Sequence, residues 1–201
     1  MRVLNDYWSR LAKQEGYPAR SVYKLQEIDE KFHILKGAER VLDVGAAPGS
    51  WTLYLLRHLS SSTQIVSVDI QPLTLEAPSS GGKRVTFIQG DITDPKIIQR
   101  LADLGPYNGI LSDAAPSTMG IRTVDTARSE ALVESVLSFL PSLLKTGGFC
   151  VVKIFQGTEG ERIFQKLKSL FSKVKAFKPR ACRSESFEVY YIGMGKQEGF
   201  N

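Results

Sequence analysis

The chain of 201 residues is long enough for one α/β domain with a single core, and its 42% hydrophobic and 23% charged residues exclude a disordered polypeptide. A net charge of +5 favours polyanionic partners without identifying one. Because Cys150 and Cys182 form no C-x-x-C motif and no apolar run could span a bilayer, we expect a cytoplasmic protein that binds neither a metal nor a membrane.

Residues 1–36 are expected to form a basic arm followed by a helix. Apolar side chains recur on one side of the segment Ala19–Phe32, which predicts a helix that packs on a sheet. Basic and aromatic side chains are interleaved here: Arg2, Tyr7, Trp8, Arg10, Lys13, Tyr17, Arg20, Tyr23 and Lys24. This pattern suits a nucleic-acid surface, and it is equally compatible with a solvated extension.

Short β-branched runs alternate with amphipathic segments along the rest of the chain. Strands are predicted at Arg40–Val44, Gln64–Asp69, Val85–Ile88, Asn108–Ser112 and Phe149–Phe155. Helices are predicted at Ser50–Leu59, Pro95–Leu104, Thr126–Leu140 and Glu159–Phe171. The alternation predicts an α/β fold with a parallel sheet and helices on both faces.

The connections carry their own signals. Pro141 should end or kink the preceding helix, and Gly147 with Gly148 should turn the chain into the next strand. The small residues of Thr74–Lys83 predict a loop. Near the end, Val174–Phe177 and Phe187–Gly193 are predicted strands with only a short polar link, which permits an antiparallel hairpin at one edge of the sheet.

A glycine-containing turn follows the first predicted strand. Gly45 and Gly49 allow a sharp bend and a close approach of the backbone to a ligand. Turns at this place in a parallel sheet hold nucleotide-like cofactors. The third glycine of the G-x-G-x-x-G pattern is missing, so a nicotinamide dehydrogenase is disfavoured.

Three aspartates fall where predicted strands end. Asp69 lies about 20 residues beyond the glycine turn, where a carboxylate accepts hydrogen bonds from a ribose diol. Asp91 could accept a hydrogen bond from an exocyclic amine, and Asp113 follows a third strand. One such acid would be explained by a turn, but three on successive strands indicate a binding site.

Together these segments resemble the signature blocks of the FtsJ/RrmJ family, the S-adenosylmethionine-dependent RNA ribose 2′-O-methyltransferases. The blocks are Arg20-Ser-x-x-Lys-Leu25, Asp43-x-Gly-Ala-Ala-Pro-Gly-x-Trp51, Val68-Asp-x-x-Pro72, Gln89-Gly-Asp91, Ser112-Asp-x-Ala-Pro116, Val152-Lys-x-Phe-Gln-Gly157 and Ser186-x-Glu-Val-Tyr190. The resemblance extends from about Asp6 to Gly193, with every block in order.

The resemblance implies a fold and a cofactor site. The fold would be the Rossmann-like class I methyltransferase, a seven-stranded, mostly parallel sheet with helices on both faces and an antiparallel last strand, in a single domain of residues 1–201. The cofactor would be S-adenosylmethionine. Gly45, Gly49 and Trp51 would cradle its methionine and ribose, Asp69 would hold the ribose diol, Asp91 the adenine edge, and Asp113 would stand beside the methionine.

The resemblance also implies a catalytic tetrad of Lys24, Asp113, Lys153 and Glu188. In methyl transfer the attacking 2′-hydroxyl must lose its proton, and a lysine can accept that proton only when it is neutral. Lys153 lies in an apolar run where an unpaired ammonium is costly, so it is the expected base. Asp113 and Glu188 are then expected to orient the lysines.

The expected activity is methylation of the ribose 2′-hydroxyl of a uridine in large-subunit (23S) ribosomal RNA by a monomeric enzyme. The segment Tyr7–Tyr17 also resembles the tRNA-modifying branch of the family, so an anticodon-loop ribose methyltransferase is the alternative. A catalytically inactive RNA-binding assembly factor is a third possibility, which an intact tetrad disfavours.

Overall fold

The structure is a computed structural model that describes residues 2–75, 84–116, 119–157, 160–183 and 186–199, with side chains from residue 7 onward. In these ranges the strands are β1 (Arg40–Val44), β2 (Gln64–Asp69), β3 (Val85–Gln89), β4 (Tyr107–Ser112), β5 (Leu144–Phe155), β6 (Phe171–Phe177) and β7 (Glu188–Lys196). The helices are α1 (Arg2–Gln14), α2 (Val22–Phe32), α3 (Ser50–His58), α4 (Pro95–Leu104), α5 (Arg122–Leu143) and α6 (Gly160–Leu170). None of the helices described is long and apolar enough to cross a membrane.

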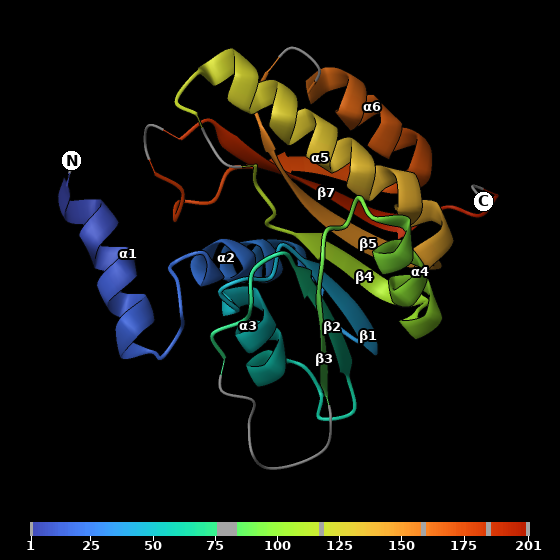
Figure 1. Ribbon diagram of the computed structural model, residues 1–201, viewed down its shortest axis with the longest axis horizontal. Coiled ribbons are helices and arrows are strands. Elements are labelled where there is room, and N and C mark those ends of the chain that lie inside the picture. The colour runs from blue at the N-terminus through green and yellow to red at the C-terminus, as the bar shows by residue number, and fades with distance from the viewer. Residues whose placement is uncertain (1, 76–83, 117–118, 158–159, 184–185, 200–201) are drawn as a thin grey trace.

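The strands form one sheet in the order β3-β2-β1-β4-β5-β7-β6 (Figure 1). The first five strands pair in parallel, as the alternating pattern predicts. The last strand, β7, runs antiparallel to both β5 and β6 and lies between them. The antiparallel hairpin and the antiparallel last strand are therefore confirmed.

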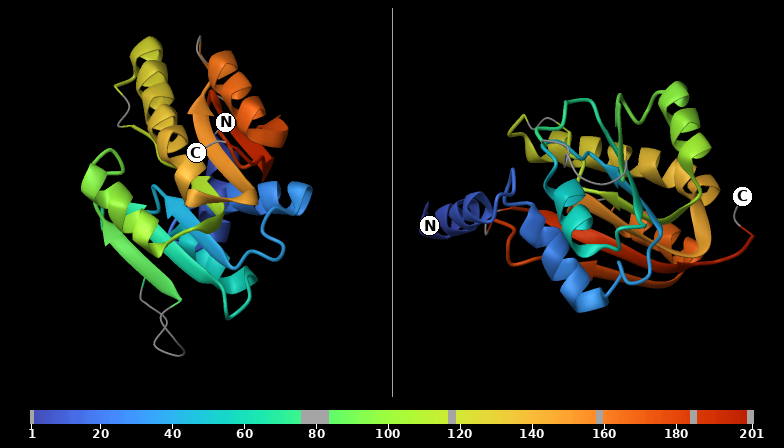
Figure 2. Two further views of the ribbon diagram at one scale, coloured as in Figure 1. Left: turned by 90° about the vertical axis from the view of Figure 1, so that its right-hand side faces the viewer. Right: turned by 90° about the horizontal axis from the view of Figure 1, so that it is seen from below.

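Helices cover both faces of the sheet, as Figure 2 shows. On one face α4, α5 and α6 bury Leu101, Val133 and Leu167. On the other face α2 and α3 bury Leu25 and Leu55. The central strands are apolar on both sides because each side lies beneath a layer of helices.

Helix α5 differs from its prediction at both ends. It begins at Arg122 and passes through Pro141 to Leu143, so Pro141 does not end the helix as one of its two predicted effects required, and the kink stays a prediction. Pro141 sits in the last turn, so the hydrogen bond that its missing N–H cannot donate is one of the last in the helix. Gly147 has φ of 78°, but it lies inside β5, which already begins at Leu144, so the predicted turn ahead of a strand at Phe149 was wrong.

The amino-terminal arm contains a helix that the sequence analysis did not identify. Helix α1 lies beside the start of α2, outside the layers that cover the sheet (Figures 1 and 2). The ring centroids of Trp8 and Tyr23 are 4.9 Å apart, and the guanidinium carbon of Arg57 lies 4.4 Å from the ring centroid of Tyr17. Helix α2 starts at Val22 rather than Ala19, after a turn. Most of the predicted loop Thr74–Lys83, and Glu159, lie outside the described residues.

A buried lysine closes the end of α5. Lys196, only 7% exposed, donates from Nζ to the carbonyl oxygens of Pro141 (2.5 Å) and Leu144 (2.9 Å). Carbonyls at a helix C-terminus lack intrahelical partners, and the helix dipole favours a cation there. Lys196 therefore supplies a donor to two carbonyl oxygens at the junction of α5 and β5.

A buried carboxyl group ties β1 to α3 and β2. Asp43 is fully buried, and its Oδ2 accepts a hydrogen bond from Thr52 Oγ1 (2.7 Å), which lies 2.9 Å from Ser67 Oγ. Among the described residues Asp43 Oδ1 has no hydrogen-bond partner. Burial raises the pKa of Asp43 to about 7. The carboxyl group is therefore mainly protonated in the folded protein only below about pH 7.

Replacing Lys196 by methionine should lower the free energy of unfolding by about 1–3 kcal/mol, because two buried carbonyl oxygens lose their donor. Urea unfolding measures the effect. Lys145→Met is the control, since Lys145 is 38% exposed and its 3.4 Å pair with Glu39 is a surface contact, worth less than about 1 kcal/mol. Equal losses in the two variants would contradict the capping role.

The raised pKa of Asp43 predicts a stability that falls as pH rises. Between an unfolded pKa near 3.8 and a folded pKa of about 7 the folded state binds the extra proton. Relative to Asp43→Asn, the native protein should lose roughly 4 kcal/mol of unfolding free energy from pH 4 to pH 7. Urea unfolding across this range checks it, and a constant difference between the two proteins would contradict it.

Candidate active site

The glycine turn after β1 is built as the sequence predicts. Gly45 has φ of 74° and Gly49, which precedes α3, has φ of 118°, values that side chains rarely tolerate. A Cβ at Gly45 would lie 2.5 Å from the Ala114 backbone, and one at Gly49 would lie 2.5 Å from Leu75. The glycines therefore let three segments of the chain approach one another closely.

A cavity of about 720 Å³ opens at the carboxyl ends of the parallel strands. Gly45, Asp69, Asp91 and Asp113, all predicted to bind a cofactor, line it. The other lining residues are Val44, Ala47, Val68, Ile70, Gln71, Gly90, Ile92, Thr93, Ala114, Ala115, Pro116, Arg128, Ala131, Leu132 and Ser135. The predicted strand-end acids thus share one site.

The carboxylates of this cavity are held by backbone amides. Asp69 accepts hydrogen bonds from Ala47 N (2.9 Å) and Gln71 N (2.8 Å), so it braces the glycine turn. Asp91 Oδ1 accepts from the amide and the hydroxyl of Thr93, both at 2.8 Å, which lowers the pKa of the exposed Asp91. Asp69 and Asp91 are therefore positioned acceptors beside the cavity.

Two predicted cofactor residues do not line this cavity. Gly49 faces Leu75, and Trp51 is 2% exposed with Nε1 donating to the Ser21 carbonyl (2.8 Å). The Trp51 ring also lies 6.0 Å from the Tyr190 ring. Trp51 thus connects α3 to α2 and β7 behind the glycine turn.

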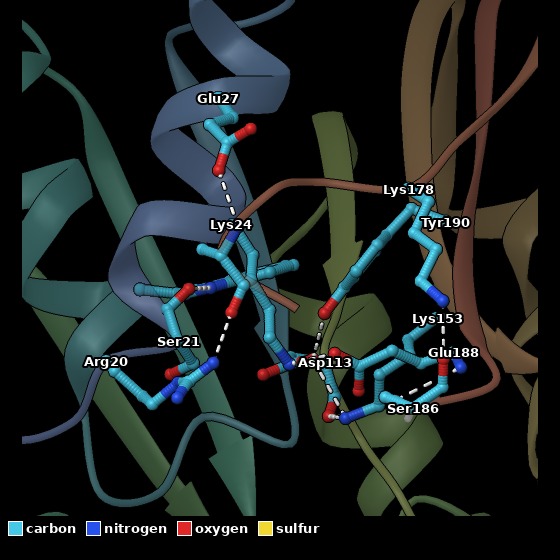
Figure 3. Close-up of polar contacts among 12 residues, drawn as sticks. Arg20, Ser21, Lys24, Glu27, Asp113, Lys153, Lys178, Ser186, Glu188 and Tyr190 are labelled. Carbon is cyan, nitrogen blue, oxygen red and sulfur yellow. Dashed lines mark hydrogen bonds and ion pairs between the residues drawn. The ribbon is translucent and has the colours of Figure 1, made fainter. Parts of the chain in front are cut away.

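The four predicted tetrad residues meet beside the cavity (Figure 3). Lys24 Nζ lies 2.7 Å from Glu188 Oε1, and Lys153 Nζ lies 2.8 Å from Asp113 Oδ1. Lys153 Nζ also donates to the Asp113 carbonyl oxygen. The residues come from α2, the end of β4, β5 and β7, so the structure brings distant segments into two ion pairs.

Tyr190 completes this cluster, although the sequence predicted it only as the last residue of the motif Ser186-x-Glu-Val-Tyr190. Its hydroxyl donates to Asp113 Oδ1 (2.7 Å), and Lys24 Nζ lies 5.9 Å from its ring centroid. Tyr190 pairs with Lys153 across β5 and β7 and lies two residues after Glu188. Strand alternation puts residues two apart on the same face, a signal that could have identified it.

The ion pairs determine the charges of the cluster. Burial raises the pKa of Asp113 and Glu188, but the lysines outweigh burial and hold both pKa values below the usual range. Burial lowers the pKa of Lys24, but Asp113 and Glu188 outweigh it and raise that pKa. Both carboxylates are therefore ionised and Lys24 is a fixed cation.

A second cavity, of about 470 Å³, lies against the opposite part of the cluster. Lys24 and Glu188 line it, whereas Asp113 lines the first cavity. Its other lining residues are Ala19, Arg20, Ser21, Gly120, Asp125, Phe155, Arg183, Ser186 and Phe187. The charged cluster therefore separates a cavity lined by three aspartates from one lined by two arginines.

Among the described residues no group of three or more His, Cys, Asp or Glu side chains is arranged to hold a metal ion.

Further residues of the site come from α5, where Arg128, Ala131, Leu132 and Ser135 line the first cavity. Their helical spacing places them on one face, but only the packing of α5 shows that this face meets the cavity.

Comparison with known proteins agrees with this architecture. The family model for FtsJ-like methyltransferases matches residues 17–196. The ribosomal RNA large subunit methyltransferase E of Treponema denticola is 50% identical over 189 residues, 94% of each chain, and its namesake from Syntrophobacter fumaroxidans is 45% identical over 193 residues, 96% of each chain. A Plasmodium falciparum crystal structure assigned as a ribosomal RNA methyltransferase matches with a TM-score of 0.77 and 27% identity, covering 90% of this chain and 98% of that one. The chain belongs to the FtsJ-like methyltransferase family.

Proposed function

We propose that this protein transfers a methyl group from S-adenosylmethionine to the ribose 2′-hydroxyl of a uridine in large-subunit (23S) ribosomal RNA. The observation that carries the proposal is the charged cluster between two cavities of different chemistry. One cavity has the acceptors for a cationic nucleoside, and the other has cations for an RNA backbone. The names of the relatives from Treponema denticola and Syntrophobacter fumaroxidans favour ribosomal RNA over tRNA.

The first cavity fits S-adenosylmethionine better than a phosphorylated cofactor. Asp69, Asp91 and Asp113 line it, and Arg128 is the one cation among its described lining residues, so acceptors and negative charge predominate. A ribose diol and an adenine amine need acceptors, while a pyrophosphate needs donors. Asp69 would hold the ribose diol, and Asp91 would accept a hydrogen bond from the adenine edge. Gly45 would let the backbone approach the cofactor closely, and Trp51 and Gly49 would support this turn from behind.

The tetrad would divide the chemistry among its members. S-adenosylmethionine supplies, when bound, an electrophilic methyl group on a sulfonium. Lys153 Nζ takes the proton of the 2′-hydroxyl when neutral, and Asp113 and Tyr190 fix its position. Lys24, a fixed cation beside Glu188, stabilises the negative charge that develops on the attacking oxygen.

The amino-terminal arm belongs to the proposal as its RNA-binding surface. The exposed Arg10 and Lys13 on α1 add positive charge to residues 1–36, the proposed RNA-binding arm of a single, monomeric domain. The protein would act on RNA in the cytoplasm, without metal or membrane. The presence of all four tetrad residues, Lys24, Asp113, Lys153 and Glu188, disfavours an inactive assembly factor.

Asp69→Ala should weaken S-adenosylmethionine binding about tenfold or more, because a charge-assisted hydrogen bond contributes roughly 1.5–3 kcal/mol. Isothermal titration calorimetry measures it, with NAD expected to show no binding. Since Asp69 also holds two amides, thermal unfolding of the variant is recorded alongside. Asp103→Ala, which removes an exposed acid on α4, is the matched control. Parental affinity in Asp69→Ala, or equal affinity for NAD, would refute the cofactor assignment.

Lys153→Ala should bind S-adenosylmethionine yet lose methyl transfer by a factor on the order of 10²–10⁴, the usual contribution of a positioned general base. Lys153→Arg should not restore activity, because a guanidinium keeps its proton. The assay is single-turnover transfer of labelled methyl to 23S ribosomal RNA and to large subunits containing it.

Lys145→Ala, a half-exposed lysine outside both cavities, controls for loss of charge. Methyl transfer by Lys153→Arg near the parental rate would show that Lys153 is a fixed charge and not the base. If the native protein methylates neither RNA form, the proposed substrate is wrong.

A further inference from the structure

The second cavity has an aromatic wall beside the charged cluster. Phe187 lines the cavity and directly precedes Glu188, the partner of Lys24. The Arg122 guanidinium carbon lies 5.3 Å from its ring centroid, and the Phe155 ring contacts it edge to face at 4.9 Å and 64°. The partly buried ring is therefore held in place from two elements, α5 and β5, rather than swinging freely.

Hydrogen bonds fix the other walls of this cavity. Asp125, 2% exposed, accepts hydrogen bonds from the amides of Met119 (2.7 Å) and Gly120 (3.1 Å). Arg20 donates to the Ala181 carbonyl (2.5 Å), which ties the start of α2 to the segment before β7. These contacts hold the segments that line the cavity in place.

The charges of the cavity suit a phosphate-bearing ligand. Among the described lining residues the cations Arg20, Lys24 and Arg183 outnumber the acids Asp125 and Glu188 by one, and Lys24 is paired with Glu188. Arg20 and the exposed Arg183 line the same cavity and contribute positive charge. Attraction of arginine for phosphate is the main sequence-independent term in binding of nucleic acids.

Size restricts what can enter. A cavity of about 470 Å³ is in the range that holds one small-molecule-sized group. A base stacked and paired within a helix does not fit into such a space, and enzymes that modify nucleotides take the target out of the stack. An aromatic ring beside an extruded base provides a stacking surface that replaces the lost neighbours.

We propose that this cavity binds the target nucleotide of the RNA in an unpaired, unstacked state, with its base against Phe187 and its phosphates toward Arg20 and Arg183. This inference rests on the proposed function and adds to it the way the acceptor ribose is presented to Lys24 and Lys153. The ring of Phe187 binds the base, and the chemistry remains with the charged cluster.

Phe187→Ala should raise the KM for a 23S ribosomal RNA fragment about tenfold and leave kcat within about twofold, as expected for loss of one stacked base. Phe187→Leu, which keeps apolar volume without an aromatic face, should lose as much. Phe187→Trp should restore the parental KM. Calorimetry with S-adenosylmethionine should give parental affinity for each variant, which shows that each is folded.

Phe164 offers a matched control outside both cavities. Its ring also has a cation, Lys168, at 5.0 Å and an edge-to-face partner, Tyr191, at 5.1 Å. Phe164→Ala should therefore keep the parental KM. A fragment whose methylated nucleotide is locked in a Watson–Crick hairpin should react more slowly than one with that nucleotide in a loop.

The outcomes separate the two proposals. Transfer by the native protein is the reference for every variant, so its absence refutes the proposed function itself. With native transfer intact, a parental KM in Phe187→Ala, an equal loss in Phe164→Ala or equal rates on paired and unpaired targets would overturn the inference. A fall in kcat alone would also overturn it, since Phe187 would then act through Glu188.

Discussion

Neutralisation of four buried charges is the constraint on which the site depends. Transferring an ionised group out of water costs several kcal/mol unless a partner compensates it. Here each ammonium lies 2.7–2.8 Å from a carboxylate, Lys24 with Glu188 and Lys153 with Asp113. The pairs link α2, the end of β4, β5 and β7, so these elements must be in register for any of the charges to be tolerated. A shift of one of these elements that kept one ion pair would leave the charges of the other pair without partners.

The position of β7 makes this register possible. Because β7 runs antiparallel beside β5, Lys153 lies opposite Tyr190, and Glu188 faces the same side as Tyr190. The approach to β7 is tied to α2 by Glu27, which accepts hydrogen bonds from the amides of Arg180 and Ala181, both at 2.8 Å. The helix that supplies Lys24 therefore also positions the segment that leads to its partner.

The charged cluster divides the site into two environments. On the strand-end side, amides hold Asp69 and Asp91 as acceptors, and acids predominate. On the other side the lining carries arginines and aromatic rings. A cationic donor and an anionic acceptor are thereby drawn to opposite sides of the same lysines. This electrostatic asymmetry agrees with the proposed binding of a cationic methyl donor and an anionic RNA next to the charged cluster.

Local periodicity and backbone freedom were enough to predict the alternating strands and helices, the glycine turn and the acids at strand ends. The family motifs predicted the four tetrad residues, which the structure brings together in two ion pairs. The packing of the folded chain determined that α5 continues through Pro141 and that Lys196, from a distant strand, donates to a carbonyl oxygen at the end of that helix. It also decided that Trp51 braces α2, that Asp43 is buried with a raised pKa, and that Phe187 faces a second cavity. Such contacts join residues far apart in the chain, and local patterns carry no information about which surfaces will meet.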